Sequence, residues 1–218
     1  GEPELAPLRL TVPADPSSAA FPLVAALLVP GSTVRLPGVG LNPTRTGLLD
    51  VLAGMGADIV VEERRELGGE PVGDLVVRGG ELAAVEVPPA AAPAMIDEYP
   101  ILAVAAALAR GRTVMHGLGE LRVKETDRLA AMAAGLAAAG VEVEAGEDWL
   151  AVTGSGGAAP RGGAVVDADH DHRIAMSFAV LGLAARDTIR VRGAETIETS
   201  FPGFVELMVG LGARLETA

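Results

Sequence analysis

One pattern of strands and helices occurs three times along this chain of 218 residues, and it constrains the possible fold more than any other feature. Segments with alternating apolar residues are typical of strands, and segments with apolar residues at helical spacing are typical of helices. In each copy these segments occur in the order β-α-β-α-β-β. The copies span approximately residues 8–80, 84–154 and 163–218. Such units pack helices inside mixed sheets. The sequence therefore predicts one α/β (α+β) domain with pseudo-threefold order over residues 1–218.

The expected strands and helices can be assigned by residue number. The first copy has them at 8–12, 19–29, 31–36, 42–56, 57–61 and 74–78. The second copy has them at 85–87, 101–109, 111–114, 124–139, 140–143 and 149–152. The third copy has them at 164–166, 174–185, 188–191, a helix opened by 199–202, and 212–215. Its fourth strand is missing from the sequence.

An aspartate stands just before the first helix of every copy: Asp15, Asp97 and Asp171. A short acidic side chain at that position accepts a hydrogen bond from the first turn and stabilises the helix by about 1 kcal/mol. The simplest interpretation is that all three are N-caps, and for Asp15 we expect nothing more.

The turn 121–128 is strongly charged although the chain is apolar on both sides of it. Lys124 and Arg128 are four residues apart, so near a helix start they are expected to share a face. Free N–H groups at a helix start add partial positive charge. With Glu125 as a neighbouring carboxylate, the turn is suited to hold an anion and move a proton. The equivalent turns 42–45 and 198–201 do not concentrate cations in this way.

Two plainer or competing interpretations remain open from local sequence. The charged turn also fits a solvated helix start, with Thr126 or Asp127 as the N-cap. A second cluster, 167–173, fits a divalent metal site of a hydrolase, or a helix start that aims Arg173 at an anion. It also fits a polar strand end in which Asp171 caps a helix and His172 is bonded locally.

Composition excludes several classes of protein. The net charge of −12 makes nucleic acid and anionic membranes poor partners. The absence of cysteine excludes disulfides, thiolate catalysis and cysteine-ligated metals. No apolar run is long enough for a membrane span, and no leader is recognisable, so we expect a cytoplasmic protein. With 3% aromatic residues, the core must consist of small and aliphatic side chains on closely packed helices.

Four motifs occur in the same order as in one known family. They are Asp97–Pro100, Leu121–Arg128, Asp171–Met176 and Thr199–Pro202. Together they resemble the C-terminal half of the 5-enolpyruvylshikimate-3-phosphate synthase (3-phosphoshikimate 1-carboxyvinyltransferase) family. Asn42-Pro43-Thr44-Arg45 is similar to the N-x-T-R signature of its class II, glyphosate-tolerant branch.

The resemblance implies a fold and a reaction. The fold would be half of a two-domain inside-out α/β barrel. The reaction transfers the enolpyruvyl group of phosphoenolpyruvate to the 5-hydroxyl of shikimate 3-phosphate and releases phosphate. It proceeds by addition, a tetrahedral ketal and elimination, in the shikimate pathway to chorismate and the aromatic amino acids. No cofactor and no metal are implied.

The resemblance also implies roles for individual residues. Asp97 would accept the proton of the attacking hydroxyl, and Glu125 would deliver or remove a proton at the methylene carbon. Asp97 and Lys124 would bind shikimate 3-phosphate. Arg128 and Arg173 would bind phosphoenolpyruvate, since a guanidinium fork suits carboxylate and phosphate. Cations around Asp97 would lower its pKa and keep it ionised.

Asp171 and His172 are expected to support these groups, with His172 orienting locally. The sequence departs from many family members at Thr199, where they have lysine, and at Glu120, where they have asparagine. Class II members, as the resemblance implies, tolerate both changes.

The resemblance implies that this sequence lacks the family's N-terminal domain. That domain supplies a lysine, serines, a glutamine and an arginine to the site, so it is an expected partner together with the two substrates. We therefore expect the chain alone to bind weakly and turn over negligibly. The alternatives are a UDP-N-acetylglucosamine enolpyruvyl transferase-like enzyme, a metal-dependent phosphoester hydrolase built on Asp167–His172, and a non-catalytic anion-binding module.

Overall fold

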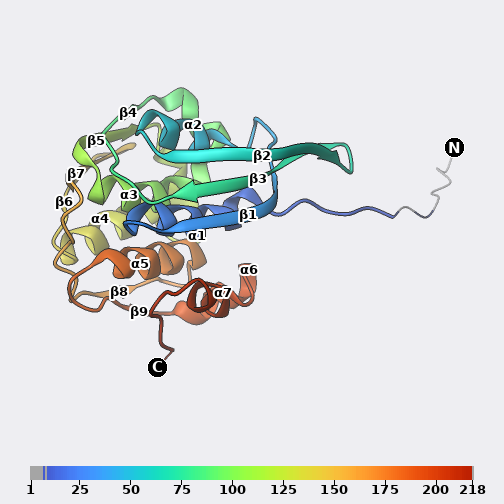
Figure 1. Ribbon diagram of the computed structural model, residues 1–218. Coiled ribbons are helices and arrows are strands. Elements are labelled where there is room, and N and C mark those ends of the chain that lie inside the picture. The colour runs from blue at the N-terminus through green and yellow to red at the C-terminus, as the bar shows by residue number, and fades with distance from the viewer. Residues whose placement is uncertain (1–6, 8, 218) are drawn as a thin grey trace, which may run out of the picture.

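Three mutually packed helices lie inside this mixed α/β fold, and strands lie around them, as the computed structural model of residue 7 and residues 9–217 shows (Figure 1). Helix α3, Tyr99–Leu108, is central, and all ten of its residues are buried. A helix that is apolar on every side has to be enclosed by other elements. Helices α1, Pro16–Leu28, and α5, His172–Ala184, pack against it.

Three sheets surround these helices. The first has the order β1 (Thr33–Gly40), β3 (Glu70–Arg78), β2 (Asp58–Leu67). The second has the order β4 (Glu86–Val87), β5 (Arg110–His116), β7 (Trp149–Ser155), β6 (Glu142–Ala145). The third pairs β8 (Val165–Asp167) with β9 (Arg190–Arg192).

The repeat is visible in the strand pairing. β4 pairs parallel with β5, and β8 pairs parallel with β9. In the first copy, the isolated parallel bridge between Ala14 and Val39 takes the corresponding position. The next pairing is antiparallel in both complete sheets, β1 with β3 and β5 with β7. The α/β fold expected from the sequence is therefore confirmed.

The remaining helices are short or peripheral. They are α2 (Gly47–Gly54), α4 (Arg128–Ala138), α6 (Ile197–Ser200) and α7 (Phe204–Gly210), with 3₁₀ helices η1 (Pro89–Ala94), η2 (Ile96–Glu98), η3 (Gly119–Val123) and η4 (Ala194–Thr196). None of the helices in the described part of the chain is long and apolar enough to cross a membrane.

The core has the small-residue character predicted from composition. Gly135 of α4 lies against the ring of Phe178 on α5, and a Cβ at Gly135 would overlap that ring. Ala103, Ala105 and Ala106 of α3 are fully buried. Small residues at these positions let the helices approach closely enough to exclude water.

Three expected elements were wrong or misplaced. Residues 9–12 form no strand, and residue 8 lies outside the described residues. Residues 213–217 form no strand either, because no described strand lies beside them to pair with their backbone groups. The first copy's second helix begins at Gly47, after a turn, and not at residue 42.

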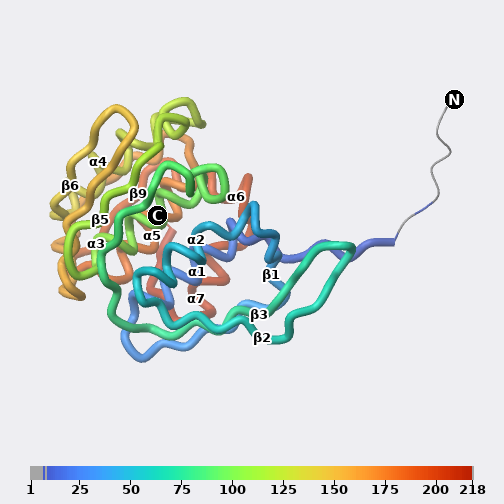
Figure 2. The backbone as a smooth tube through the Cα atoms, turned by 90° about the horizontal axis from the view of Figure 1, so that it is seen from above, coloured from blue at the N-terminus to red at the C-terminus, as the bar shows by residue number. Residues whose placement is uncertain are grey.

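The β2–β3 hairpin projects beyond the helical body, which is clearest from above (Figure 2). Leu10 and Thr11 contact Gly68 at its tip, so the segment before α1 follows the hairpin. The charged turns of the second and third copies lie elsewhere, at the ends of the buried helices.

Candidate active site

Asp97 lies where three segments meet: η2, the turn before α4, and the N-terminus of α5. Its Oδ1 is 3.3 Å from Lys124 Nζ and 2.9 Å from Arg128 Nη1. Its Oδ2 is 3.8 Å from Arg173 Nη2. The structure thus brings together four residues singled out in the sequence, from two different copies of the repeat.

Arg128 is almost completely buried, with its side chain 1% exposed. Each guanidinium nitrogen faces a different carboxylate. Nε donates to Asp171 Oδ2 at 2.6 Å, Nη1 to Asp97 Oδ1 at 2.9 Å, and Nη2 to Glu125 Oε2 at 2.6 Å. The solvated-helix interpretation of the turn is therefore wrong for this residue.

The three partners of Arg128 differ in their access to solvent. Asp171 is fully buried, whereas the side chains of Asp97 and Glu125 are 36% and 47% exposed. The Nε side of the guanidinium, the inner edge, is consequently held by a carboxylate that solvent does not reach. Nη1 and Nη2, the outer edge, face carboxylates that are partly open to solvent.

Asp171 performs two tasks at once. Its Oδ1 accepts from the backbone N–H groups of Arg173 at 2.8 Å and Ile174 at 3.3 Å, which caps α5. Its Oδ2 accepts from Arg128. One buried carboxylate therefore fixes both the start of α5 and the arginine of the neighbouring copy.

Lys124 does not share a helical face with Arg128, contrary to the sequence expectation. It follows η3 in an extended conformation, and α4 begins only at Arg128. Its Nζ lies 2.8 Å from Glu120 Oε1 as well as near Asp97. The two cations still converge, because both reach the same oxygen of Asp97.

The N-cap predictions were right for two aspartates and wrong for the third. Asp15 accepts from Ser18 N and Asp171 from Arg173 N. Asp97 lies within η2, and Glu98 is the N-cap residue of α3, without a capping side-chain bond. Instead of a helix start, Asp97 faces the cationic side chains of Lys124, Arg128 and Arg173.

The charged turn is also anchored by Arg122 and Asp127, which were given no part in binding or catalysis. Asp127 caps α4 through Ala130 N at 2.9 Å, which confirms one of the two N-cap candidates. Arg122 donates to Asp127 Oδ2 at 2.7 Å and to the carbonyl oxygens of Glu147 and Gly146. Their common effect is to hold the turn against the β6–β7 hairpin.

The environment shifts the pKa values of two site residues in opposite directions. Partial burial, the largest single influence, acts to raise the pKa of Asp97, but the charges of Arg173, Lys124 and Arg128 together lower it. The hydrogen bond to Glu120 raises the pKa of Lys124, with help from Asp97 and against burial. Both groups are therefore charged near neutral pH.

His172 is the second residue of the Asp-His-Arg motif, at the first position of α5. Burial, and to a smaller extent the charge of Arg173, lowers its pKa. A neutral imidazole beside the site adds no further positive charge at neutral pH.

The acidic and histidine cluster before α5 does not converge on one point. Asp167 Oδ1 accepts from Asp169 N at 3.0 Å, and Asp169 Oδ2 accepts from Thr126 Oγ1 at 2.8 Å. Asp171 is directed at Arg128. Among the described residues, no group of three His, Asp or Glu side chains is arranged to hold a metal ion.

One contact at the site was missed from the sequence. The carboxylate of Glu98, next to Asp97 in the chain, accepts from Arg173 Nη1 at 3.3 Å. Its only sequence signal was its position inside the Asp-Glu-Tyr-Pro motif, where a buried acidic residue cannot be distinguished from an exposed one.

The sequence profile described as EPSP synthase (3-phosphoshikimate 1-carboxyvinyltransferase) matches residues 1–208. This chain belongs to the EPSP synthase family. A 3-phosphoshikimate 1-carboxyvinyltransferase of Rhodospirillum rubrum is 61% identical over 213 residues, 98% of this chain and 47% of the relative. One of Paramagnetospirillum magneticum is 62% identical over 215 residues, 99% of this chain and 48% of the relative.

A solved EPSP synthase from Acinetobacter baumannii has the same fold, with a TM-score of 0.92 and 44% sequence identity. The match covers 95% of this chain and 48% of that one. The chain thus spans about half the length of the EPSP synthases it matches. These comparisons favour neither the UDP-N-acetylglucosamine enzyme nor the metal-dependent hydrolase.

Proposed function

We propose that this chain provides half of the active site of a 3-phosphoshikimate 1-carboxyvinyltransferase, and that it binds shikimate 3-phosphate and phosphoenolpyruvate. The observation that carries the proposal is the convergence of Lys124, Arg128 and Arg173 on Asp97. Family membership supports the reaction, and the names of the relatives identify it. No cofactor enters the proposal, because both substrates carry the groups that react.

The cations suit two substrates that carry phosphate and carboxylate groups. Arg128 and Arg173 would bind phosphoenolpyruvate through their guanidinium forks. Lys124 would bind shikimate 3-phosphate as a compact point charge. The chain as a whole carries a net charge of −12, so this local concentration of cations is what would draw the anions in.

The two half-exposed carboxylates would carry the proton transfers. Asp97, ionised at neutral pH, takes the proton of the 5-hydroxyl as that oxygen bonds to C2 of phosphoenolpyruvate. Glu125 gives a proton to C3, which becomes a methyl group in the tetrahedral ketal. Glu125 then removes a methyl proton while the bond from C2 to the phosphate oxygen breaks, and phosphate leaves with the electron pair.

This sequence requires Glu125 to change partner. In the free protein, Glu125 Oε2 accepts from Arg128 Nη2 at 2.6 Å, so this oxygen is not available to a substrate carbon. An anionic substrate that binds Nη1 and Nη2 of Arg128 would release Glu125 from this bond and let it reach the methylene carbon. Binding of the anionic substrate to Arg128 is thereby coupled to the release of Glu125.

Further parts of the proposal concern what lies around the chain. The relatives are about twice as long as this chain, which supports a second, N-terminal domain that completes the site. We also propose a cytoplasmic location, where the two phosphorylated substrates would be available.

The test is phosphate release from shikimate 3-phosphate and phosphoenolpyruvate, with this chain alone and with a separately produced N-terminal half of a close relative. We expect release only from the mixture and only with both substrates. Addition of a chelator should leave the rate unchanged. A fully active isolated chain, or a rate that chelation abolishes, would contradict the proposal.

A further inference from the structure

Glu98 is a buried carboxylate for which the proposed reaction has no direct use. It is 5% exposed, although its neighbour Asp97 faces the open side of the site. Burial raises its pKa, and a hydrogen bond with Ser17 and then the charge of Arg173 oppose this shift. An ionisable group is costly to bury unless a specific contact compensates the cost.

The Glu98 carboxylate contacts one corner of the Arg173 guanidinium group. Nη1 donates both to Glu98 Oε1 at 3.3 Å and to the backbone carbonyl of Asp97 at 3.2 Å. Nη2 lies 3.8 Å from Asp97 Oδ2, beyond hydrogen-bond distance. One corner is thus anchored, while the other is close to the catalytic carboxylate without being bonded to it.

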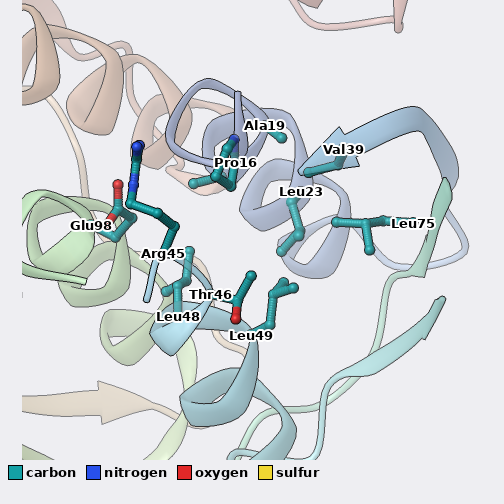
Figure 3. A pocket seen from close by; sticks show the side chains of 11 residues that line it. Pro16, Ala19, Leu23, Val39, Arg45, Thr46, Leu48, Leu49, Leu75 and Glu98 are labelled. Carbon is teal, nitrogen blue, oxygen red and sulfur yellow. The ribbon is translucent and has the colours of Figure 1, made fainter. Parts of the chain in front are cut away.

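A second arginine, from the first copy of the repeat, reinforces this arrangement. Arg45 and Glu98 line the same narrow pocket between α1 and α2 (Figure 3). Arg45 is held by Asp15 Oδ1 at 3.1 Å and Ser17 Oγ at 3.0 Å, and its charge favours the ionised form of Glu98. The first copy therefore adds a cation to the surroundings of Glu98.

We infer that Glu98 is a positioning residue that holds the Arg173 guanidinium away from Asp97 and presents its free edge to the carboxylate or phosphate of phosphoenolpyruvate. The inference rests on the proposed function. Without the charge of Glu98, Arg173 is free to close on Asp97, which removes a cation from the anion site. A misplacement of this kind acts mainly on the substrate that Arg173 binds.

The test is Glu98→Gln in the complemented enzyme, because glutamine keeps the shape and removes the charge. We expect the KM for phosphoenolpyruvate to rise by about fivefold to tenfold, and that for shikimate 3-phosphate to change less than about twofold. Glu98→Asp keeps the charge and should recover part of the loss. Glu81→Gln, at a carboxylate on an exposed side chain 3.9 Å from Arg110, is the matched control.

A double-mutant cycle separates positioning from a general structural effect. In an Arg173→Gln background, Glu98→Gln should cause no further rise in the KM for phosphoenolpyruvate. The inference would be overturned if Glu98→Gln raised the KM for phosphoenolpyruvate as much in the Arg173→Gln background as in the parent. An unchanged KM for phosphoenolpyruvate in a folded Glu98→Gln enzyme would also overturn it. If Glu98→Gln does not fold, Glu98→Met, which removes the charge at similar volume, is the second variant, and an unchanged KM for phosphoenolpyruvate in it overturns the inference. Failure of the proposed function would be distinct, because the unmutated mixture would then release no phosphate.

Discussion

Two aspartates in the described part of the chain, Asp74 and Asp97, each contact two or more basic side chains, but their exposure to solvent differs. Asp74, on the β1-β3-β2 sheet, accepts from Arg35 at 3.0 Å, from Arg65 at 3.0 Å and from the backbone N–H of Gly38 at 2.9 Å. Its side chain is 7% exposed, whereas those of the two arginines are 45% and 43% exposed.

Around Asp97 the exposure is reversed. The side chain of Asp97 is 36% exposed, and those of Lys124, Arg128 and Arg173 are 22%, 1% and 15% exposed. At Asp74 the anion is enclosed and the cations face water, so the cluster holds a sheet together. At Asp97 the cationic side chains are mostly buried and the carboxylate is partly exposed. An anionic ligand would therefore be able to compete with this carboxylate for the cations.

The largest expected effect is on catalysis. Asp97→Asn should lower kcat in the complemented enzyme by roughly 10²–10⁴-fold, because it removes the proposed general base. Asp74→Asn should lower the thermal midpoint and leave the phosphate-release rate of the folded protein close to that of the parent. Equal losses of rate in the two variants would remove the distinction between the clusters.

The second-largest effect is expected on the free energy of unfolding, when the buried carboxylate that holds Arg128 is changed. Asp171→Asn leaves the guanidinium of Arg128 without its buried partner, and breaking a buried ion pair costs about 3–5 kcal/mol. Urea denaturation of the isolated chain measures this loss of unfolding free energy. Thr44→Ala, which removes a hydroxyl bonded to Asn42 in an exposed turn, serves as the control. A cost as small as the control's would mean that Asp171 is not the support of Arg128.

A smaller effect is expected on binding. Arg173→Ala should weaken the calorimetric affinity of the complemented enzyme for phosphoenolpyruvate by about 1.5–3 kcal/mol, the value of a charge-assisted contact. Arg35→Ala removes an equally charged arginine from the Asp74 cluster and should leave the affinity unchanged. Unchanged binding in Arg173→Ala would exclude this residue from the anion site.

The smallest effect is expected on the pH dependence of stability, through the adjacent carboxyl groups of Asp97 and Glu98. Their pKa values are shifted in opposite directions, with Asp97 below and Glu98 above the ordinary values of about 3.9 and 4.3. Asp97 therefore stabilises the fold above its unfolded pKa, and this contribution is lost as pH falls through its lower folded pKa. For Glu98 the contribution is present at low pH and is lost as pH rises through its higher folded pKa.

Carboxyl carbon NMR of the folded chain would resolve the two titrations. We expect the Asp97 midpoint to lie below that of Glu98 by more than their ordinary difference. Coincident midpoints would show that the cations around Asp97 do not govern its ionisation.

Local pattern was sufficient to predict the repeat and the caps at Asp15 and Asp171, and it left Thr126 and Asp127 as alternative caps of α4. The grouping of the charged residues into one site was implied by the family resemblance. Local pattern was insufficient where tertiary contacts decide. The position of Lys124 depends on η3, which ends before α4 begins, and no periodicity in the sequence indicates that break. Asp97 faces cations from two other segments, so its failure to cap α3 is not encoded locally.

Burial of charge was the other property that could not be read from sequence. Arg128 and Glu98 stand in charged motifs that resemble solvated turns, and only the packing of the three copies encloses them. The expected strand at 212–215 failed for a related reason, because a strand forms only beside a partner.

The most direct test of the account is a crystal structure of the complemented enzyme with shikimate 3-phosphate and a non-reactive analogue of phosphoenolpyruvate. The account predicts substrate oxygens within about 3 Å of Arg128, Arg173 and Lys124, with the outer edge of Arg128 released from Glu125 and its Nε still on Asp171. Substrates bound elsewhere, or Arg128 still bonded to all three carboxylates while both substrates are present, would contradict it.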